Sequence, residues 1–180
     1  LARHDQLVFK PARGNCGIGI GFVESRELAP DTLVAWMRDR GFDLVEERVP
    51  QHPALNALSP SGVNTVRIFT CLDAQDRCRI LGCRLRVSVA SPVDNMAAGN
   101  LVAPIDEATG RVDGPAVYSD ITKPKQSAHP VTGMAIEGFQ IPCWEETLAM
   151  VREASELHTQ NRSIGWDVVI TPDGPGLIEG

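Results

Sequence analysis

Residues 165–180 read Gly-Trp-Asp-Val-Val-Ile-Thr-Pro-Asp-Gly-Pro-Gly-Leu-Ile-Glu-Gly. Two short apolar runs flank a Pro-Asp-Gly turn, which predicts a β-hairpin. Counting outward in equal steps from Asp173 at the tip places Asp167 directly opposite Glu179, on the same face. Because like charges directly opposite each other are destabilising, the pattern predicts a positive group between the two carboxylates.

Two interpretations of this acidic pair stay open. Opposed carboxylates suit Mg²⁺, which takes one or two protein carboxylates and completes its coordination with water and substrate phosphates. Alternatively, Arg86 or Lys10 lies between the acids as a salt-bridge partner. Under the metal interpretation, Asp167→Asn is expected to leave the stability of the ligand-free chain unchanged or raised, because the substitution relieves like-charge repulsion.

Upstream of the hairpin, strand patterns outnumber helix patterns. Alternating or apolar runs predict strands over 6–10, 18–23, 42–49, 64–71, 78–90 and 101–105. Helices are predicted over 30–40, ended by Gly41, and over 142–159. Residues 50–63 are expected to be loop with one turn of helix, and 106–142 turn-rich with a short strand near 116–118. This pattern predicts an α+β fold of antiparallel sheets with few helices and no βαβ repeat.

Composition sets the broad class. A chain of 180 residues with 43% hydrophobic content fits one large domain or two small lobes. The net charge of −6 argues against a general nucleic-acid surface, and no apolar run is long enough to span a membrane. The five cysteines show no metal-ligand spacing, which fits reduced thiols in the cytoplasm. The chain begins without Met and ends within a strand, so we expect a piece of a longer protein, truncated at both ends.

A lysine followed by glycines forms a second candidate site. Lys10 ends an apolar strand, and Gly14, Gly17 and Gly19 follow it. Such glycines let the backbone offer N–H groups to phosphate oxygens while the lysine supplies a charge. The order differs from a Walker A loop, in which the lysine follows the glycines. An ordinary hairpin turn with an exposed lysine is the alternative.

Arg67, Arg84 and Arg86, all within predicted strands, form a third candidate set. Arg67 stands between apolar residues, and Arg84 and Arg86 share one strand face because side chains repeat every two residues. A guanidinium suits bidentate binding of carboxylate or phosphate, whereas the alternative is a solvated strand face. Asp94 and Asn95 add a polar pair downstream. His129, in a loop beside a proline, is more typical of a structural than of a catalytic histidine.

Taken in chain order, these segments resemble the ATP-grasp superfamily, and most closely its sugar-transfer-associated domain, related to the glutamate-ligase-like and glutathione-synthetase-like branches. The segments that carry the resemblance are Val-Phe-Lys-Pro with the glycine loop (8–21), Leu-Val-Glu-Glu-Arg-Val (44–49), Asn-Thr-Val-Arg (64–67), Arg-Leu-Arg (84–86), Asp-Asn (94–95), Ala-Pro-Ile-Asp (103–106), His-Pro-Val-Thr-Gly (129–133) and the hairpin 165–180. The resemblance implies an ATP-grasp fold with a nucleotide cleft between two lobes. The implied small lobe, 1–50, carries the glycine loop and hinge strand; the larger lobe, 51–180, carries the arginines and the metal site.

The resemblance also implies roles for the residues of the smaller lobe. Lys10 matches the lysine that touches the ATP phosphates, and the loop with Gly14, Gly17 and Gly19 matches the loop that closes over them. The implied adenine-binding hinge comprises Glu46, Glu47 and Val49.

In the larger lobe, Arg86 matches the arginine that steadies the transferring phosphate, and Arg67 joins it as an implied catalytic residue. Asp167 and Glu179 match the carboxylates that hold Mg²⁺, or Mn²⁺ in its place. The family pattern continues with an asparagine at position 181 and includes an upstream lobe, and neither is part of this sequence.

The implied function is a Mg-ATP-dependent ligase that joins a small carboxylate to an amine or a hydroxyl, including a sugar acceptor, through an acyl-phosphate. The family's surroundings associate it with cell-surface sugar or exopolysaccharide modification. The alternative is a non-catalytic ATP-binding module of a glycan pathway. A pure binder has no need of Arg86, so the combination of Lys10, Arg86, Asp167 and Glu179 favours the enzyme.

Overall fold

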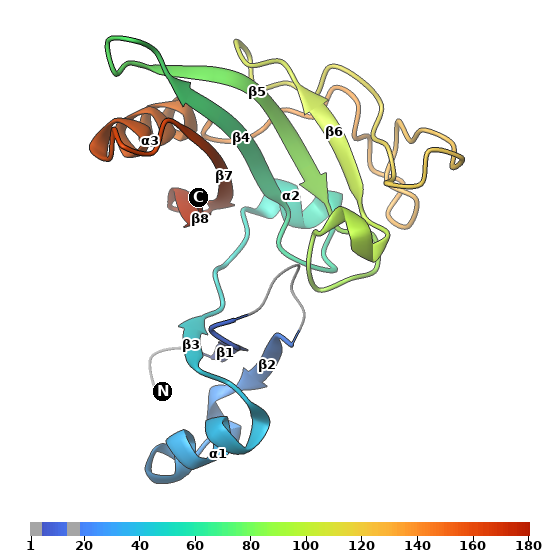
Figure 1. Cartoon of the computed structure of the whole chain (residues 1–180). Helices are drawn as coiled ribbons and strands as arrows, with labels where there is room; N and C mark the ends of the chain where they lie inside the picture. The colour runs from blue at the N-terminus through green and yellow to red at the C-terminus, as the bar shows by residue number, and fades with distance from the viewer. Residues whose placement is uncertain (1–4, 14–18) are drawn as a thin grey trace. The chain divides into compact units, whose positions relative to one another are not determined.

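A computed structural model describes residues 5–13 and 19–180 (Figure 1). The chain divides into two compact units, Leu1–Val49 and Pro50–Gly180. Each unit has its own antiparallel sheet, so each is described by itself.

The smaller unit contains a three-stranded sheet in the order β2-β1-β3. Its strands are β1 (Gln6–Lys10), β2 (Gly21–Glu24) and β3 (Leu44–Glu47), and helix α1 (Leu33–Arg40) follows the 3₁₀ turns Ser25–Glu27 and Pro30–Thr32. Phe9 is fully buried and packs edge-on against Trp36 of α1, at 4.9 Å between ring centroids. Gly41 ends α1 in the left-handed conformation, as the sequence predicts.

The larger unit contains a five-stranded antiparallel sheet in the order β6-β5-β4-β7-β8 (Figure 1). The strands are β4 (Thr65–Leu72), β5 (Cys78–Val87), β6 (Leu101–Ile105), β7 (Ser163–Thr171) and β8 (Gly174–Glu179). The helical elements are α2 (Pro53–Leu58), the 3₁₀ turn η3 (Met96–Ala98) and α3 (Trp144–Leu157).

The two faces of this sheet differ in chemistry because successive side chains of a strand point to opposite sides. One face contributes fully buried residues such as Ile68, Leu85 and Val168 to the core, which also takes in buried residues of α2, α3 and the segment 106–142. The opposite face carries the alternate positions, including Arg67, Arg86 and Asp167. We call it the polar face.

The predicted α+β class is confirmed, since two antiparallel sheets hold most of the regular structure and the helices are few. The expected strand near 116–118 is absent as an element; Ala116 and Val117 form only isolated bridges, to Gln126 and Val102. The expected strand 18–23 begins at Gly21 among the described residues, and Ile18 lies outside them.

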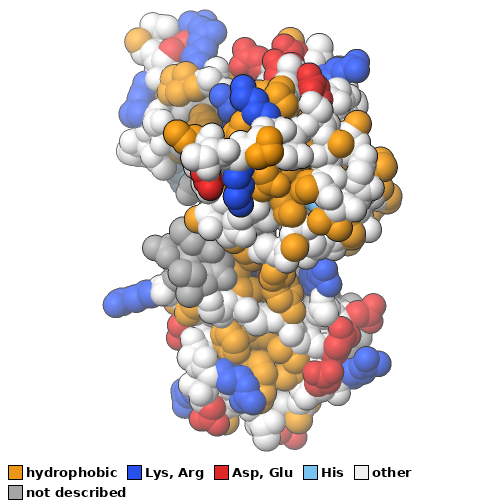
Figure 2. Space-filling view, turned by 90° about the vertical axis from the view of Figure 1, so that its right-hand side faces the viewer, with side chains coloured by type: hydrophobic (Ala, Val, Ile, Leu, Met, Phe, Trp, Pro, Cys, Tyr) orange, Lys and Arg blue, Asp and Glu red, His pale blue; other side chains and the backbone are white. Residues whose placement is uncertain are grey.

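Charged side chains of both signs are interspersed on the face shown in Figure 2. None of the helices in the described part of the chain has the length and apolar content needed to cross a bilayer.

Gly110 offers a test of the core. It has φ +71°, and a Cβ there would lie 2.2 Å from Cγ of buried Trp144. Gly110→Ala should therefore lower the free energy of unfolding by roughly 2–4 kcal/mol, combining left-handed strain with overpacking. Gly99 has φ +84° and open space around it, so Gly99→Ala should cost only about 1–2 kcal/mol. Denaturant unfolding of both variants checks this, and equal losses would contradict the packing argument.

Candidate functional site

The hairpin β7–β8 brings the two predicted acids opposite each other by an unexpected route. Thr171 pairs with Gly174, so the tip has two residues rather than three, and this register alone would pair Asp167 with Ile178. The register shifts between Asp167 and Val168, and Asp167 pairs with Glu179 across this β-bulge. The predicted pairing is confirmed, although the count that predicted it assumed a different turn.

Asp167 lies between two guanidinium groups on the polar face. Arg67, directly opposite it on β4, donates from Nε to Oδ1 and from Nη2 to Oδ2, the latter at 2.7 Å. Arg86 on β5 donates from Nη1 to Oδ2 at 2.8 Å. Asp167 is only 4% exposed, and a buried carboxylate requires such charged partners.

A second buried acid holds the other side of Arg86. Nη2 of Arg86 lies 2.9 Å from Oδ1 of Asp94. The other oxygen of Asp94 accepts hydrogen bonds from the backbone N–H of Thr65, at 2.9 Å, and from the Thr65 hydroxyl. The arginines and acids thus alternate in a row of ion pairs that runs from Arg67 through Asp167 and Arg86 to Asp94.

The two acids have pKa values shifted in opposite directions. Burial alone would raise the pKa of Asp167, but the hydrogen bond from Arg67 and the charges of Arg86 and Arg67 outweigh burial and lower it. Burial raises the pKa of Asp94, and its contacts with Arg86 and Thr65 offset only part of that effect. The pKa of Arg67 is raised, chiefly by its hydrogen bond to Asp167.

The positive group predicted between the two carboxylates is an arginine pair on Asp167, and among the described residues neither arginine forms an ion pair with Glu179. Of the two residues named in the salt-bridge interpretation, Arg86 makes this contact, and Arg67 joins it. This contact overturns the expectation that Asp167→Asn is neutral or stabilising, because Asn would leave two guanidiniums without their shared charge. Glu179 is exposed, and the described residues give it no hydrogen bond or ion pair.

The carboxylates of Asp167 and Glu179 keep acceptor positions of the kind that Mg²⁺ binds. Three hydrogen bonds fill three of the roughly four acceptor positions of the Asp167 carboxylate, which leaves one on Oδ1. Glu179, directly opposite, has its carboxylate uncommitted among the described residues. No group of three or more acidic, His or Cys side chains suited to a metal occurs among the described residues, but Mg²⁺ needs only one or two protein carboxylates.

In the smaller unit, Lys10 and Glu46 form an ion pair between neighbouring strands. Both side chains are partly exposed, by 28% and 50%. Gly19 has φ +79°, a conformation that favours glycine, whereas Gly14 and Gly17 lie outside the described residues. Of the residues in the predicted adenine-binding hinge, Glu47 is the last residue of β3 and Val49 lies two residues beyond it.

The sequence analysis gave no functional role to two polar residues that contact the row of ion pairs on the polar face. Thr65 and Asp94 lie 29 positions apart, and their contact follows from strand pairing rather than from spacing. Their only signal is that Asn64-Thr65-Val66-Arg67 and Asp94-Asn95 each place polar residues beside apolar ones. Arg84, directly opposite Arg67, is exposed and donates to the carbonyl of Cys83 at 2.7 Å.

His129 and Cys83 of the larger unit are structural residues. His129 is 2% exposed; its Nδ1 accepts from the Thr132 N–H at 3.1 Å, which leaves Nε2 to donate to the Ser88 carbonyl at 2.8 Å. Burial raises the pKa of the Cys83 thiol to about 12, so it is not a nucleophile at neutral pH.

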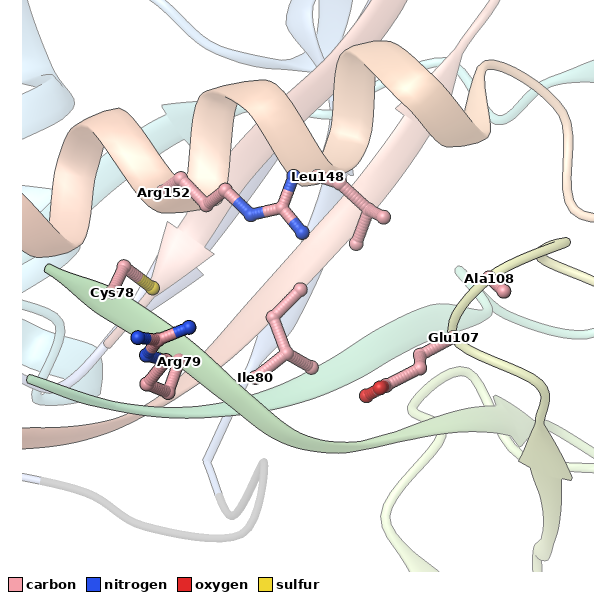
Figure 3. A pocket seen from close by; sticks show the side chains of 7 residues that line it. All are labelled: Cys78, Arg79, Ile80, Glu107, Ala108, Leu148 and Arg152. Carbon is pink, nitrogen blue, oxygen red and sulfur yellow. The ribbon is translucent and has the colours of Figure 1, made fainter. Parts of the chain in front are cut away.

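A hollow of about 460 Å³ lies between β5 and α3 (Figure 3). Arg79 and Arg152 line one end and Glu107 the other, with Ile80 and Leu148 between them. The hollow shares no residue with the row of ion pairs on the polar face.

The comparisons with known proteins agree with the resemblance in the sequence. The family model described as sugar-transfer associated ATP-grasp matches residues 1–180. No curated protein matches the chain.

Asp167→Asn should destabilise the larger unit. At pH 7 we expect the free energy of unfolding to fall by roughly 2–4 kcal/mol, since both guanidiniums lose their shared partner in a mostly buried site. Asp73→Asn is the control, because Asp73 pairs with Arg77 and Arg79, whose side chains are well exposed. Asp73→Asn should lower the free energy of unfolding much less than Asp167→Asn does.

The pH dependence gives a second readout of the same contact. The pKa of Asp167 is lower in the folded than in the unfolded chain, so its stabilisation is present above about pH 4 and is lost as the pH falls through the folded-state pKa. The stability difference between the native chain and Asp167→Asn should therefore shrink below pH 4. Urea unfolding from pH 2.5 to 7 measures it, and a constant difference would refute the charge assignment.

Proposed function

Because the chain belongs to the sugar-transfer associated ATP-grasp family, we propose that it is a Mg-ATP-dependent ligase. It joins a carboxylate to an amine or to a hydroxyl, such as a sugar hydroxyl. The reaction belongs to the cytoplasmic steps of cell-surface glycan modification. A carboxylate oxygen attacks the γ-phosphorus of ATP, the bond to the bridging oxygen breaks, and ADP leaves. The amine or hydroxyl then attacks the acyl carbon, and phosphate departs while the acceptor loses its proton.

The observation that carries this proposal is the alternation of Arg67, Asp167, Arg86 and Asp94 beside Glu179. Phosphoryl transfer needs positioned positive charge more than a protein nucleophile. Asp167 and Glu179 would hold Mg²⁺ or Mn²⁺, which supplies charge neutralisation for phosphate oxygens when bound. Arg86 and Arg67 present guanidiniums that their acidic partners keep in place, ready for the charge of the transferring group.

The smaller unit supplies nucleotide contacts in the proposed function. Lys10 binds ATP phosphates, together with backbone N–H groups of the loop that contains Gly14, Gly17 and Gly19. The backbone of Glu46, Glu47 and Val49 meets the adenine edge. In support, Glu46 already holds the Lys10 ammonium at the end of β1 in an exposed pair, which exchanges partners at little cost.

Trapping of the acyl-phosphate tests the proposal. The purified full-length protein is incubated with Mg-ATP, a small-molecule cell extract and hydroxylamine, which captures acyl-phosphates as hydroxamates that mass spectrometry identifies. We expect ATP-dependent hydroxamate formation, lowered at least 100-fold by Arg86→Gln. Arg79→Gln is the control, since Arg79 lies near the start of the same strand, β5, where it pairs with Asp73 and not with Asp167 or Asp94. ATP binding without any hydroxamate would leave only a binding module.

Lys10→Ala should weaken ATP binding without abolishing the fold. Loss of a charged hydrogen bond costs about 1.5–3 kcal/mol, which corresponds to a roughly 10- to 150-fold rise in the dissociation constant. Lys123→Ala is the matched control, because Lys123 lies over the Tyr118 ring in the larger unit. Isothermal titration with Mg-ATP measures both, and an unchanged constant for Lys10→Ala would remove Lys10 from the site.

A further inference from the structure

We propose that Asp94 is a positioning residue that fixes the guanidinium plane of Arg86 independently of Asp167. The proposal rests on the proposed function only for its effect on turnover; the contact itself is a property of the larger unit. The observation that carries the proposal is that Arg86 lies between Asp167 and Asp94, and that Thr65 in turn donates to Asp94.

Arg86 needs two ion-pair partners to fix its guanidinium, because its side chain is long and flexible. Its two terminal nitrogens bind different acids, with Nη1 on Asp167 at 2.8 Å and Nη2 on Asp94 at 2.9 Å. A guanidinium held through one nitrogen can still turn about its bonds, whereas two anchors on its fork define its plane. Arg86 is accordingly the better covered arginine of the pair, with a side chain 16% exposed against 29% for Arg67.

Asp94 is itself braced from both sides. Its Oδ2 accepts from the N–H and the hydroxyl of Thr65, which lies on β4 two residues before Arg67. The loop that presents Asp94 is held by Asn100, which is fully buried. Asn100 donates to the carbonyls of Val93, at 2.7 Å, and Asn95, at 2.9 Å.

The two acids on Arg86 differ in what else they can do. Asp167 keeps an acceptor position free and lies opposite Glu179, so the proposed cation would draw on its oxygens. Asp94 is 7% exposed and engages Arg86 and Thr65; by the same count it also keeps one acceptor position on Oδ1, but it lies in a loop where no strand register among the described residues places a second carboxylate opposite it. Asp94 is therefore the partner that can hold Arg86 in one place whatever Asp167 binds.

The first arm of the test measures the Arg86 guanidinium directly in the ligand-free protein. Nitrogen-15 NMR reports the rate of rotation about its Nε–Cζ bond, with the signal assigned through Arg86→Lys. Asp94→Asn should speed this rotation at least 10-fold, and Asp94→Glu should restore part of the restraint. Asp73→Asn, which removes an acid from Arg77 and Arg79, should leave the Arg86 signal unchanged. An unchanged rotation rate in Asp94→Asn would overturn the proposal.

The second arm measures turnover with Mg-ATP and the extract fraction that supports hydroxamate formation. Asp94→Asn should lower kcat at least 10-fold with the KM for ATP within about two-fold, because Arg86 acts on the transferring group rather than on nucleotide affinity. Faster rotation with an unchanged kcat would show that the restraint has no part in catalysis and would overturn the functional half. Absence of hydroxamate with the native protein counts against the proposed function alone, since the rotation rate still decides the contact.

A milder pair of variants covers the outcome in which Asp94→Asn fails to fold. Thr65→Val removes the hydroxyl that holds Asp94 while keeping the side-chain shape, and Thr65→Ser retains it. We expect faster Arg86 rotation in Thr65→Val only. Equal rates in both variants would contradict the bracing of Asp94 by Thr65.

Discussion

The larger unit depends on one carboxylate held between two guanidiniums. Asp167 lies on β7, Arg67 on the neighbouring β4 and Arg86 on β5 beyond it, so a single acid ties three strands together. A charge that is 4% exposed is tolerated only while both partners stay in reach. The strand order and register of this sheet are therefore constrained by electrostatics on one face as well as by apolar packing on the other.

Two of the charged assemblies among the described residues differ in how easily they exchange partners. The pair of Lys10 and Glu46 is exposed, and such pairs contribute only about 0.2–1 kcal/mol. In the proposed function, an incoming phosphate would replace Glu46 as the partner of Lys10 with little loss. The buried contacts of Asp167 and Asp94 lack that freedom, because the departure of either partner would leave the other as an unpaired charge away from water. One assembly suits reversible capture of a ligand, the other a fixed arrangement around a reacting group.

Local pattern was enough to predict the α+β class, the strand 101–105 and the helix that begins near Trp144, because apolar periodicity reports the buried face. It was not enough for the segment 106–142, whose isolated bridges have no periodic signal. The site shows the same limit. Arg67 and Asp167 are 100 positions apart, and only the pairing of β4 with β7 brings them together. The bulge at Asp167 had no sequence signal at all.

That bulge has a consequence for how the hairpin can vary over evolutionary time. Glu179 faces Asp167 because of the number of residues between them, since the two-residue tip and the bulge together set the count. Substitutions at Pro172 or Asp173 that keep a tight turn leave the spacing intact. A residue inserted within either strand, between the tip and Asp167 or between the tip and Glu179, would move Glu179 out of line unless the bulge disappeared at the same time. Insertions and deletions within these two strands are therefore tolerated only in compensating pairs, whereas the turn residues can change.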